Sequence, residues 1–145
     1  MSMPDLQIEE LLPHRHPFLF VERITAVESG HSVQGFFRVP GDHPYINRMG
    51  GQPVFPAFLL VEALGQVAAL CIHPSPASSS AAPRPLGYLV RVDHCWFDSG
   101  VYADDCVSLS ARLLASFGTL HKFEACGEVA GNPVVRAHIT LYLNL

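Results

Sequence analysis

One long apolar segment constrains the fold of this chain more than any other feature. Phe58 to Ile72 carries hydrophobic side chains on almost every side, which is typical of a helix surrounded by the rest of the protein. Pro53 and Pro56 precede it, and a proline is tolerated in a first helical turn because no N–H partner is needed there. We therefore expect a buried central helix that begins close to Pro56.

The few polar residues of this segment fall on one line. Gln66, Ala69 and His73 follow Glu62 by four, seven and eleven residues, which places all of them on one stripe of a helix. Two interpretations remain open. The stripe is either a seam that faces solvent, or it aims a carboxyl group into an apolar cleft, where acid/base chemistry becomes possible.

Length and cysteine usage indicate one domain in a reducing compartment. The chain has 145 residues and a mass of 15.8 kDa, so we expect a single domain over residues 1–145. Its four cysteines are widely spaced and form no C-x-x-C pair, which favours free thiols over a disulfide framework or a structural zinc site. The first residues form no basic and apolar signal segment, and the longest apolar run is too short for a membrane span. These features predict a cytoplasmic protein without a membrane anchor.

Charge and hydrophobicity exclude one class of partner and favour another. Nine basic residues stand against thirteen acidic ones, and no basic run suggests a nucleic-acid surface. Charged residues make up only 15% of the chain, whereas 49% of its residues are hydrophobic. A small core cannot easily hide that much apolar surface, so we expect an oligomer, most simply a homodimer.

The residues before the central helix predict a short helix, two strands and a loop. Asp5 can cap a helix over Leu6 to Leu12. Phe18 to Glu28 and Ser32 to Val39 have the β-branched and aromatic content of strands. Prolines and glycines break every regular pattern from Pro40 to Gln52, which predicts a loop.

The residues after the helix predict an antiparallel sheet. Residues 74–85 contain only Pro, Ser, Ala and one Arg, so we expect a mobile surface loop there. Leu86 to Phe97 and the segments that follow alternate in hydrophobicity, with turns at Phe117–Gly118 and Gly131–Asn132. The prediction is an α+β fold in which an antiparallel sheet wraps around the long central apolar helix, the outline of a hotdog fold.

Three segments also resemble a known family. Leu12 to Ile24, LPHRHPFLFVERI, resembles the opening of the bacterial 3-hydroxyacyl-carrier-protein dehydratases (FabZ/FabA-like) of fatty-acid synthesis. Pro53 to Ala63, followed by Gln66, is similar to the motif with which that family enters its helix. Val92 to Phe97, with Asp105 after it, resembles the strand and turn that line the same site.

The resemblance implies an assembly and a reaction. Two hotdog chains would join their sheets edge to edge, and each of two sites would combine Glu62 of one subunit with the loop before the helix of the other. A phosphopantetheine arm of an acyl carrier protein would bring the acyl chain into a narrow apolar tunnel. Water would then be eliminated: a base takes the α-proton, an acid protonates the leaving hydroxyl, and donors at the helix amino end polarise the thioester carbonyl.

The chain departs from the family pattern at the base. The family has a histidine fourteen positions before the helix glutamate, and Arg48 occupies that position here. An arginine stays protonated and cannot accept the α-proton. The residue after Pro56 is glycine in the family and Ala57 here, which narrows the approach to its N–H without removing it.

Three hypotheses follow from this departure. In the first, His43 replaces the missing base and the chain is a dehydratase; the alternative interpretation of His43 is a solvated loop residue. In the second, the chain binds acyl-carrier substrates without chemistry or pairs with an active paralogue, and Arg48 holds a carboxylate or a phosphate. In the third, Glu62 alone activates water and the chain is a thioesterase.

The predicted site therefore contains two catalytic candidates, Glu62 and His43. Six further residues are predicted to bind substrate: Arg48, Phe55, Pro56, Ala57, Gln66 and Trp96. His14 and His16 form an H-x-H pair, but no third ligand accompanies them, so we expect neither a metal nor a cofactor.

Overall fold

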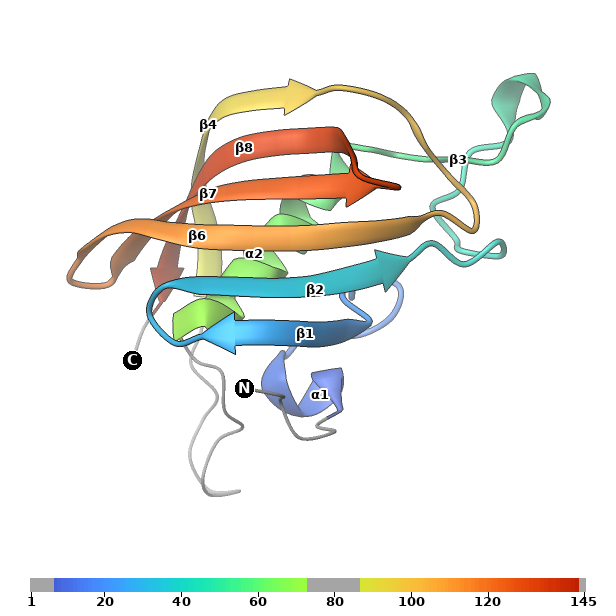
Figure 1. Ribbon diagram of the computed structural model, residues 1–145. Helices are drawn as coiled ribbons and strands as arrows, with labels where there is room; N and C mark the ends of the chain where they lie inside the picture. The colour runs from blue at the N-terminus through green and yellow to red at the C-terminus, as the bar shows by residue number, and fades with distance from the viewer. Residues whose placement is uncertain (1–6, 73–86, 144–145) are drawn as a thin grey trace.

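The computed structural model of the protein describes residues 7–72 and 87–143, and shows a curved sheet wrapped around one helix (Figure 1). The elements in chain order are α1 (Ile8–Leu11), β1 (Arg23–Glu28), β2 (Ser32–Arg38), the 3-10 turn η1 (Met49–Gly51), β3 (Val54–Phe55), α2 (Leu59–Ile72), β4 (Gly87–Phe97), β5 (Val101–Tyr102), β6 (Cys106–Phe117), β7 (Leu120–Val129) and β8 (Asn132–Leu143). The main sheet has six strands in the order β1-β2-β6-β7-β8-β4, and every neighbouring pair is antiparallel. The predicted α+β hotdog fold is confirmed.

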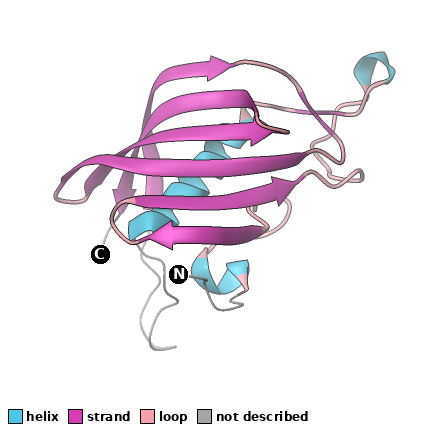
Figure 2. Cartoon of the chain, viewed as in Figure 1, coloured by secondary structure: helices cyan, strands magenta, loops and turns pink. Residues whose placement is uncertain are grey.

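The two-residue alternation of the strands explains how the sheet covers α2. Along β6, Val107, Leu109 and Ala111 point inward and are at most 3% exposed, whereas the residues between them face outward. The helix packs on this inner face against β6, β2, β8 and β7, and Figure 2 shows it lying behind the strands. Burial on both sides explains why α2 is apolar almost all round.

A small second sheet positions the amino end of α2. Its strands β3 and β5 are antiparallel, with Phe55 opposite Val101. Asn47 and Val54 also exchange two backbone hydrogen bonds of 2.8 Å, which closes the segment between them into a loop that carries η1. In Figure 1 this short turn stands away from the main sheet, at the right. The sequence pattern predicted only loop over Pro40 to Gln52, the segment that contains η1.

The predicted strand over Phe18 to Glu28 is correct only in its second half, because β1 begins at Arg23. The backbone of Phe18 and Phe20 is instead hydrogen-bonded to the side chain of Gln66. The first helix is shorter than predicted, and Gln7 is its N-cap. Asp5, His73 and the predicted loop over residues 74–85 lie outside the described residues.

Strand β4 forms one edge of the sheet, and its inner face is poorly covered by α2. Val92 and Phe97 are 41% and 51% exposed, whereas their partners on β8, Ile139 and Val135, are fully buried. An exposed apolar edge strand invites pairing with another chain.

The four cysteines all lie in the described ranges, and all four are free thiols, as predicted. Within those ranges, neither helix has the length and apolar character required to cross a bilayer.

Candidate functional site

The central helix presents one carboxyl side chain, that of Glu62, near its amino end. The side chain is 26% exposed, so it is half-buried. Gln66, one turn later, is 1% exposed. The interpretation of this stripe as a seam that faces solvent is therefore wrong, because its amide lies inside the protein.

Gln66 connects Glu62 to the segment before β1. Its Oε1 accepts a hydrogen bond of 2.8 Å from the backbone N–H of Phe20, and its Nε2 donates one of 2.9 Å to the backbone carbonyl of Phe18. These two partners fix the orientation of the amide, since a carbonyl must accept from nitrogen and an N–H must donate to oxygen. The same Nε2 lies 3.4 Å from Oε1 of Glu62.

His14 is a member of this site that the sequence pattern did not identify. Its Nε2 lies 3.4 Å from Oε1 of Glu62, and its side chain is 28% exposed. The two residues are 48 positions apart, so no helical or strand spacing links them. The sequence signal for His14 is its position within the family-like run LPHRHPFLFVERI, although its H-x-H spacing suggests only a metal ligand.

His43 lies in an aromatic cluster rather than in a solvated loop. The residue is 5% exposed, and the rings of Phe20, Phe37 and Phe55 lie 5.3 to 6.2 Å from its ring, centroid to centroid. Its Nδ1 accepts a hydrogen bond of 3.2 Å from the backbone N–H of Tyr45, and its Nε2 is buried without a hydrogen-bond partner. Burial, followed by the neighbouring His16, lowers the pKa of His43, which keeps its imidazole neutral. The interpretation of His43 as a solvated residue is wrong.

Arg48 is exposed and is not brought to Glu62 within the chain. Its guanidinium donates a hydrogen bond of 2.9 Å to the backbone carbonyl of Gly41, which lies on the same loop. The residue immediately precedes η1, on the loop that stands away from the sheet (Figure 1). Its charged group is therefore presented at the surface of the single chain.

Three of the remaining predicted residues surround the start of α2. Phe55 is fully buried in the single chain and packs against His43 in its aromatic cluster. Pro56 and Ala57 are half-buried, and their carbonyls accept hydrogen bonds from Leu59 and Leu60 at the first turn. These bonds use the N–H groups of Leu59 and Leu60, so a donor to a carbonyl oxygen at this end has to come from the residues that precede Leu59.

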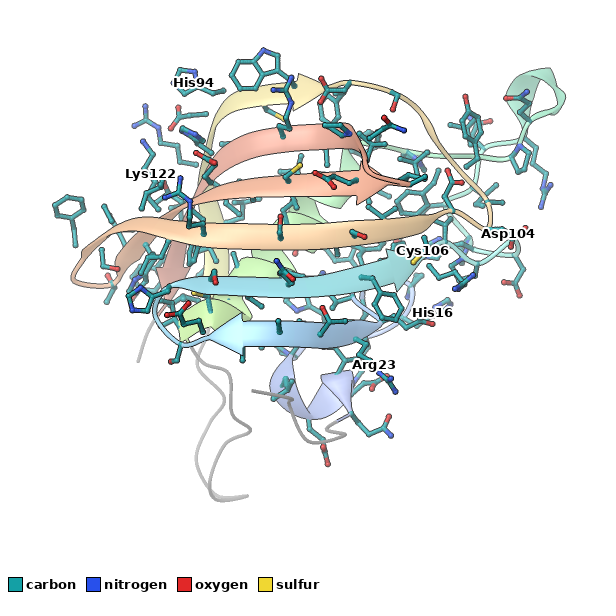
Figure 3. The ribbon with its side chains drawn as sticks, in the orientation of Figure 1. His16, Arg23, His94, Asp104, Cys106 and Lys122 are labelled. Carbon is teal, nitrogen blue, oxygen red and sulfur yellow. The ribbon has the colours of Figure 1, made fainter. Side chains whose placement is uncertain are left out.

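Trp96, the last of the predicted substrate-binding residues, lies on β4, and its role stays a prediction. Trp96 is 51% exposed and faces outward, with the Arg136 guanidinium 5.4 Å from its ring centroid. A β-bulge is the reason. Asp93 pairs with His138 and Trp96 pairs with Arg136, so β4 has one residue more than β8 between these two pairs. The extra residue reverses which side chains of β4 face inward and which face outward. Figure 3 shows His94, within this bulge, projecting at the β4 edge of the sheet. Trp96 therefore lies on the face of β4 opposite to that of Phe97.

The arrangement of these residues supports proton transfer. A half-buried carboxylate is fixed by an amide and an imidazole, and it lies beside a helix amino end that can polarise a carbonyl. Among residues 7–72 and 87–143, no group of three His, Cys, Asp or Glu side chains is placed to hold a metal ion.

Comparison with known sequences assigns the chain to a family. The model of the FabA-like domain matches residues 12–138. The 3-hydroxyacyl-[acyl-carrier-protein] dehydratase FabZ of Bacillus subtilis (strain 168) is 33% identical over 138 residues, covering 94% of this chain and 95% of the relative. The FabZ of Listeria monocytogenes serovar 1/2a is 32% identical over 139 residues, covering 95% and 94%.

Solved structures agree on the fold. The dehydratase heterocomplex ApeI:P from Xenorhabdus doucetiae matches with a TM-score of 0.79 at 20% identity, covering 98% of this chain and 93% of that one. A hypothetical thioesterase with coenzyme A from Streptococcus pneumoniae matches with a TM-score of 0.64 at 13% identity, covering 84% of each chain. With relatives of this identity along almost its whole length, the chain belongs to the FabA-like dehydratase family of hotdog proteins.

Proposed function

We propose that this protein removes water from 3-hydroxyacyl thioesters carried on an acyl carrier protein, in fatty-acid or polyketide-type biosynthesis. The observation that carries the proposal is the Glu62 carboxyl group, held at a defined position on an otherwise apolar helix by Gln66. Phe58 lies four residues before Glu62, in the turn that leads into α2, and is 67% exposed, which offers apolar surface to an acyl chain. The FabZ relatives, named for this reaction, support the same substrate class.

The reaction breaks two bonds and requires two proton transfers. A base takes the proton from the α-carbon of the thioester, and the electron pair of that C–H bond forms the double bond to the β-carbon. The β-hydroxyl leaves as water after Glu62 protonates it. The amino end of α2, at Pro56 and Ala57, stabilises the negative charge that develops on the thioester oxygen.

The base in this proposal is His43. Its neutral imidazole is the form that accepts a proton. Nδ1 accepts a hydrogen bond from Tyr45, so the hydrogen of the ring is on Nε2. The α-proton therefore goes to Nδ1 after Tyr45 has released it, or to Nε2 after the ring has changed tautomer. Arg48 cannot take this role, because a guanidinium stays protonated. Since His43 is 5% exposed in the single chain, the aromatic cluster around it has to open for its imidazole to reach substrate.

The proposed working unit is a pair of chains joined at the β4 edges, in the cytoplasm. The poorly covered inner face of β4, with Val92 and Phe97, supports an apolar interface along that edge. The partner chain is a second copy or a paralogue. The four free thiols agree with a reducing compartment.

A second candidate function is that of an accessory subunit which binds the acyl carrier substrate beside an active dehydratase chain. Arg48, at the family's histidine position, favours it, and so does the likeness to a chain of a dehydratase heterocomplex. In that function the exposed guanidinium of Arg48 holds a carboxylate or the phosphate of the phosphopantetheine arm.

Mass spectrometry of the carrier-bound product tests these functions. The purified protein is incubated alone with a 3-hydroxyacyl thioester of an acyl carrier protein. Loss of one water supports the proposed dehydratase. Hydrolysis to the free carrier identifies a thioesterase that uses Glu62 alone, and an unchanged substrate that remains bound identifies the accessory function. Either of the last two results overturns the dehydratase proposal.

A further inference from the structure

We infer that His14 is the positioning residue of Glu62: it fixes one carboxylate oxygen so that the other faces the substrate. The inference rests on the proposed function, and it assigns a role to a histidine outside the family's histidine position. Its basis is the contact between Nε2 of His14 and Oε1 of Glu62, at 3.4 Å within one chain.

In the described chain, His14 and Gln66 contact the same oxygen of the Glu62 carboxylate. Nε2 of His14 and Nε2 of Gln66 each lie 3.4 Å from Oε1. Two donors that converge on one oxygen leave Oε2 to meet the hydroxyl of the substrate. Distances of 3.4 Å are long for hydrogen bonds, and catalytic contacts of this kind commonly shorten when substrate binds.

The surroundings of the His14 ring indicate which nitrogen carries the hydrogen. Nδ1 is buried and has no hydrogen-bond partner in the described chain. A neutral imidazole has one N–H donor and one acceptor nitrogen, and an N–H buried at Nδ1 would remain unsatisfied. The hydrogen is therefore on Nε2, where it points toward the carboxylate of Glu62.

The backbone of His14 is held in place although it belongs to no helix or strand. The Arg15 guanidinium donates hydrogen bonds to the carbonyls of His14 at 2.7 Å, Leu12 at 2.8 Å and Glu9 at 3.1 Å. Leu12 is itself 2% exposed and belongs to the core. A positioning residue is effective only if its own position is fixed, and these contacts provide that support.

The kinetic test replaces His14 by asparagine or by glutamine, because the side-chain amide nitrogen of each lies close to the position of a different imidazole nitrogen. Glutamine places its Nε2 close to the position of histidine Nε2, whereas asparagine reaches only the position of Nδ1. We expect His14→Asn to lower kcat about 10-fold to 100-fold with little change in KM, as removal of supporting partners does at metal sites. His14→Gln is expected to recover most of this loss. His31→Gln, at an exposed position of the β1–β2 turn, is the control and is expected to match the wild type.

A second measurement is independent of activity. The imidazole ¹⁵N shifts of His14 are recorded by NMR in the wild type and in Glu62→Leu, which removes the acceptor. We expect the Nε2-protonated form in the wild type at pH 8, and a change of both ring nitrogens in the variant. Unchanged shifts would overturn the inference, as would full kcat in His14→Asn. An inactive wild type would instead overturn the proposed function, and the NMR comparison alone would then decide whether the contact exists.

Discussion

At the scale of single residues, Gln66 is the side chain on which the geometry of the site depends. It is buried, and its amide joins Glu62 to the backbone of Phe18 and Phe20. The segment before β1 has no strand partner there, so the amide replaces the hydrogen bonds of a strand. The same three contacts stabilise the fold and orient the carboxylate.

Replacement of Gln66 by leucine is expected to destabilise the protein. The change leaves the N–H of Phe20 and the carbonyl of Phe18 without their partner, and each buried group left unsatisfied costs about 1–3 kcal/mol. We expect the free energy of unfolding to fall by about 2–4 kcal/mol in urea titrations. The same substitution at the exposed Gln34 is the control and is expected to stay within about 0.5 kcal/mol of the wild type. Equal stabilities for the two variants would contradict the role of Gln66.

His43 predicts a dependence of stability on pH. Burial, and then His16, lower its pKa in the folded protein, whereas the backbone of Pro17 and then Asp42 act in the opposite sense. The unfolded chain therefore binds more protons between the lowered pKa and the ordinary imidazole value, so stability is lost as pH falls through that range. We expect the stability of the wild type relative to His43→Phe to decrease from pH 8 to pH 5, in denaturant titrations at each pH. A constant difference would show that His43 is as easily protonated in the folded state as in the unfolded state.

At the scale of elements, sequence patterns predict the helices and strands that depend on residues close together in the chain. The central helix and the hairpins of β6, β7 and β8 follow from periodicity and turn residues, and the structure confirms them. Three features could not be found in this way. The irregular segment at Phe18 depends on Gln66, which lies 48 residues away, and the contact of His14 spans the same separation. Trp96 faces outward because one extra residue in β4 reverses the alternation of inward and outward side chains.

The exposed inner face of β4 predicts the effect of a charge at that edge. We expect Val92→Lys to convert a dimer into a monomer, because a lysine on an edge strand opposes pairing with another chain. Leu114→Lys is the control, since Leu114 is 39% exposed against 41% for Val92 and lies on β6. Size-exclusion chromatography with light scattering measures both masses. A dimer that persists in Val92→Lys, or dissociates equally in Leu114→Lys, would place the interface elsewhere.

At the scale of the whole molecule, a single chain contains Glu62 but leaves two parts exposed, the β4 edge and the loop that carries Arg48. The β4 edge exposes apolar side chains, and the loop that carries Arg48 stands away from the main sheet that wraps around α2 (Figure 1). Both features agree with a site completed by a second chain, as the family resemblance implies. Within such a site, we propose that the Glu62 carboxyl group performs the chemistry.

The most direct test compares the wild type with Glu62→Gln in the mass assay on a 3-hydroxyacyl carrier thioester. The amide keeps the shape of the side chain but cannot protonate the leaving hydroxyl. We predict that the rate of water loss falls by about 10²-fold or more, the usual effect of losing a positioned acid. Circular dichroism of the variant checks that the fold is retained. Water loss at the wild-type rate in Glu62→Gln would contradict the account.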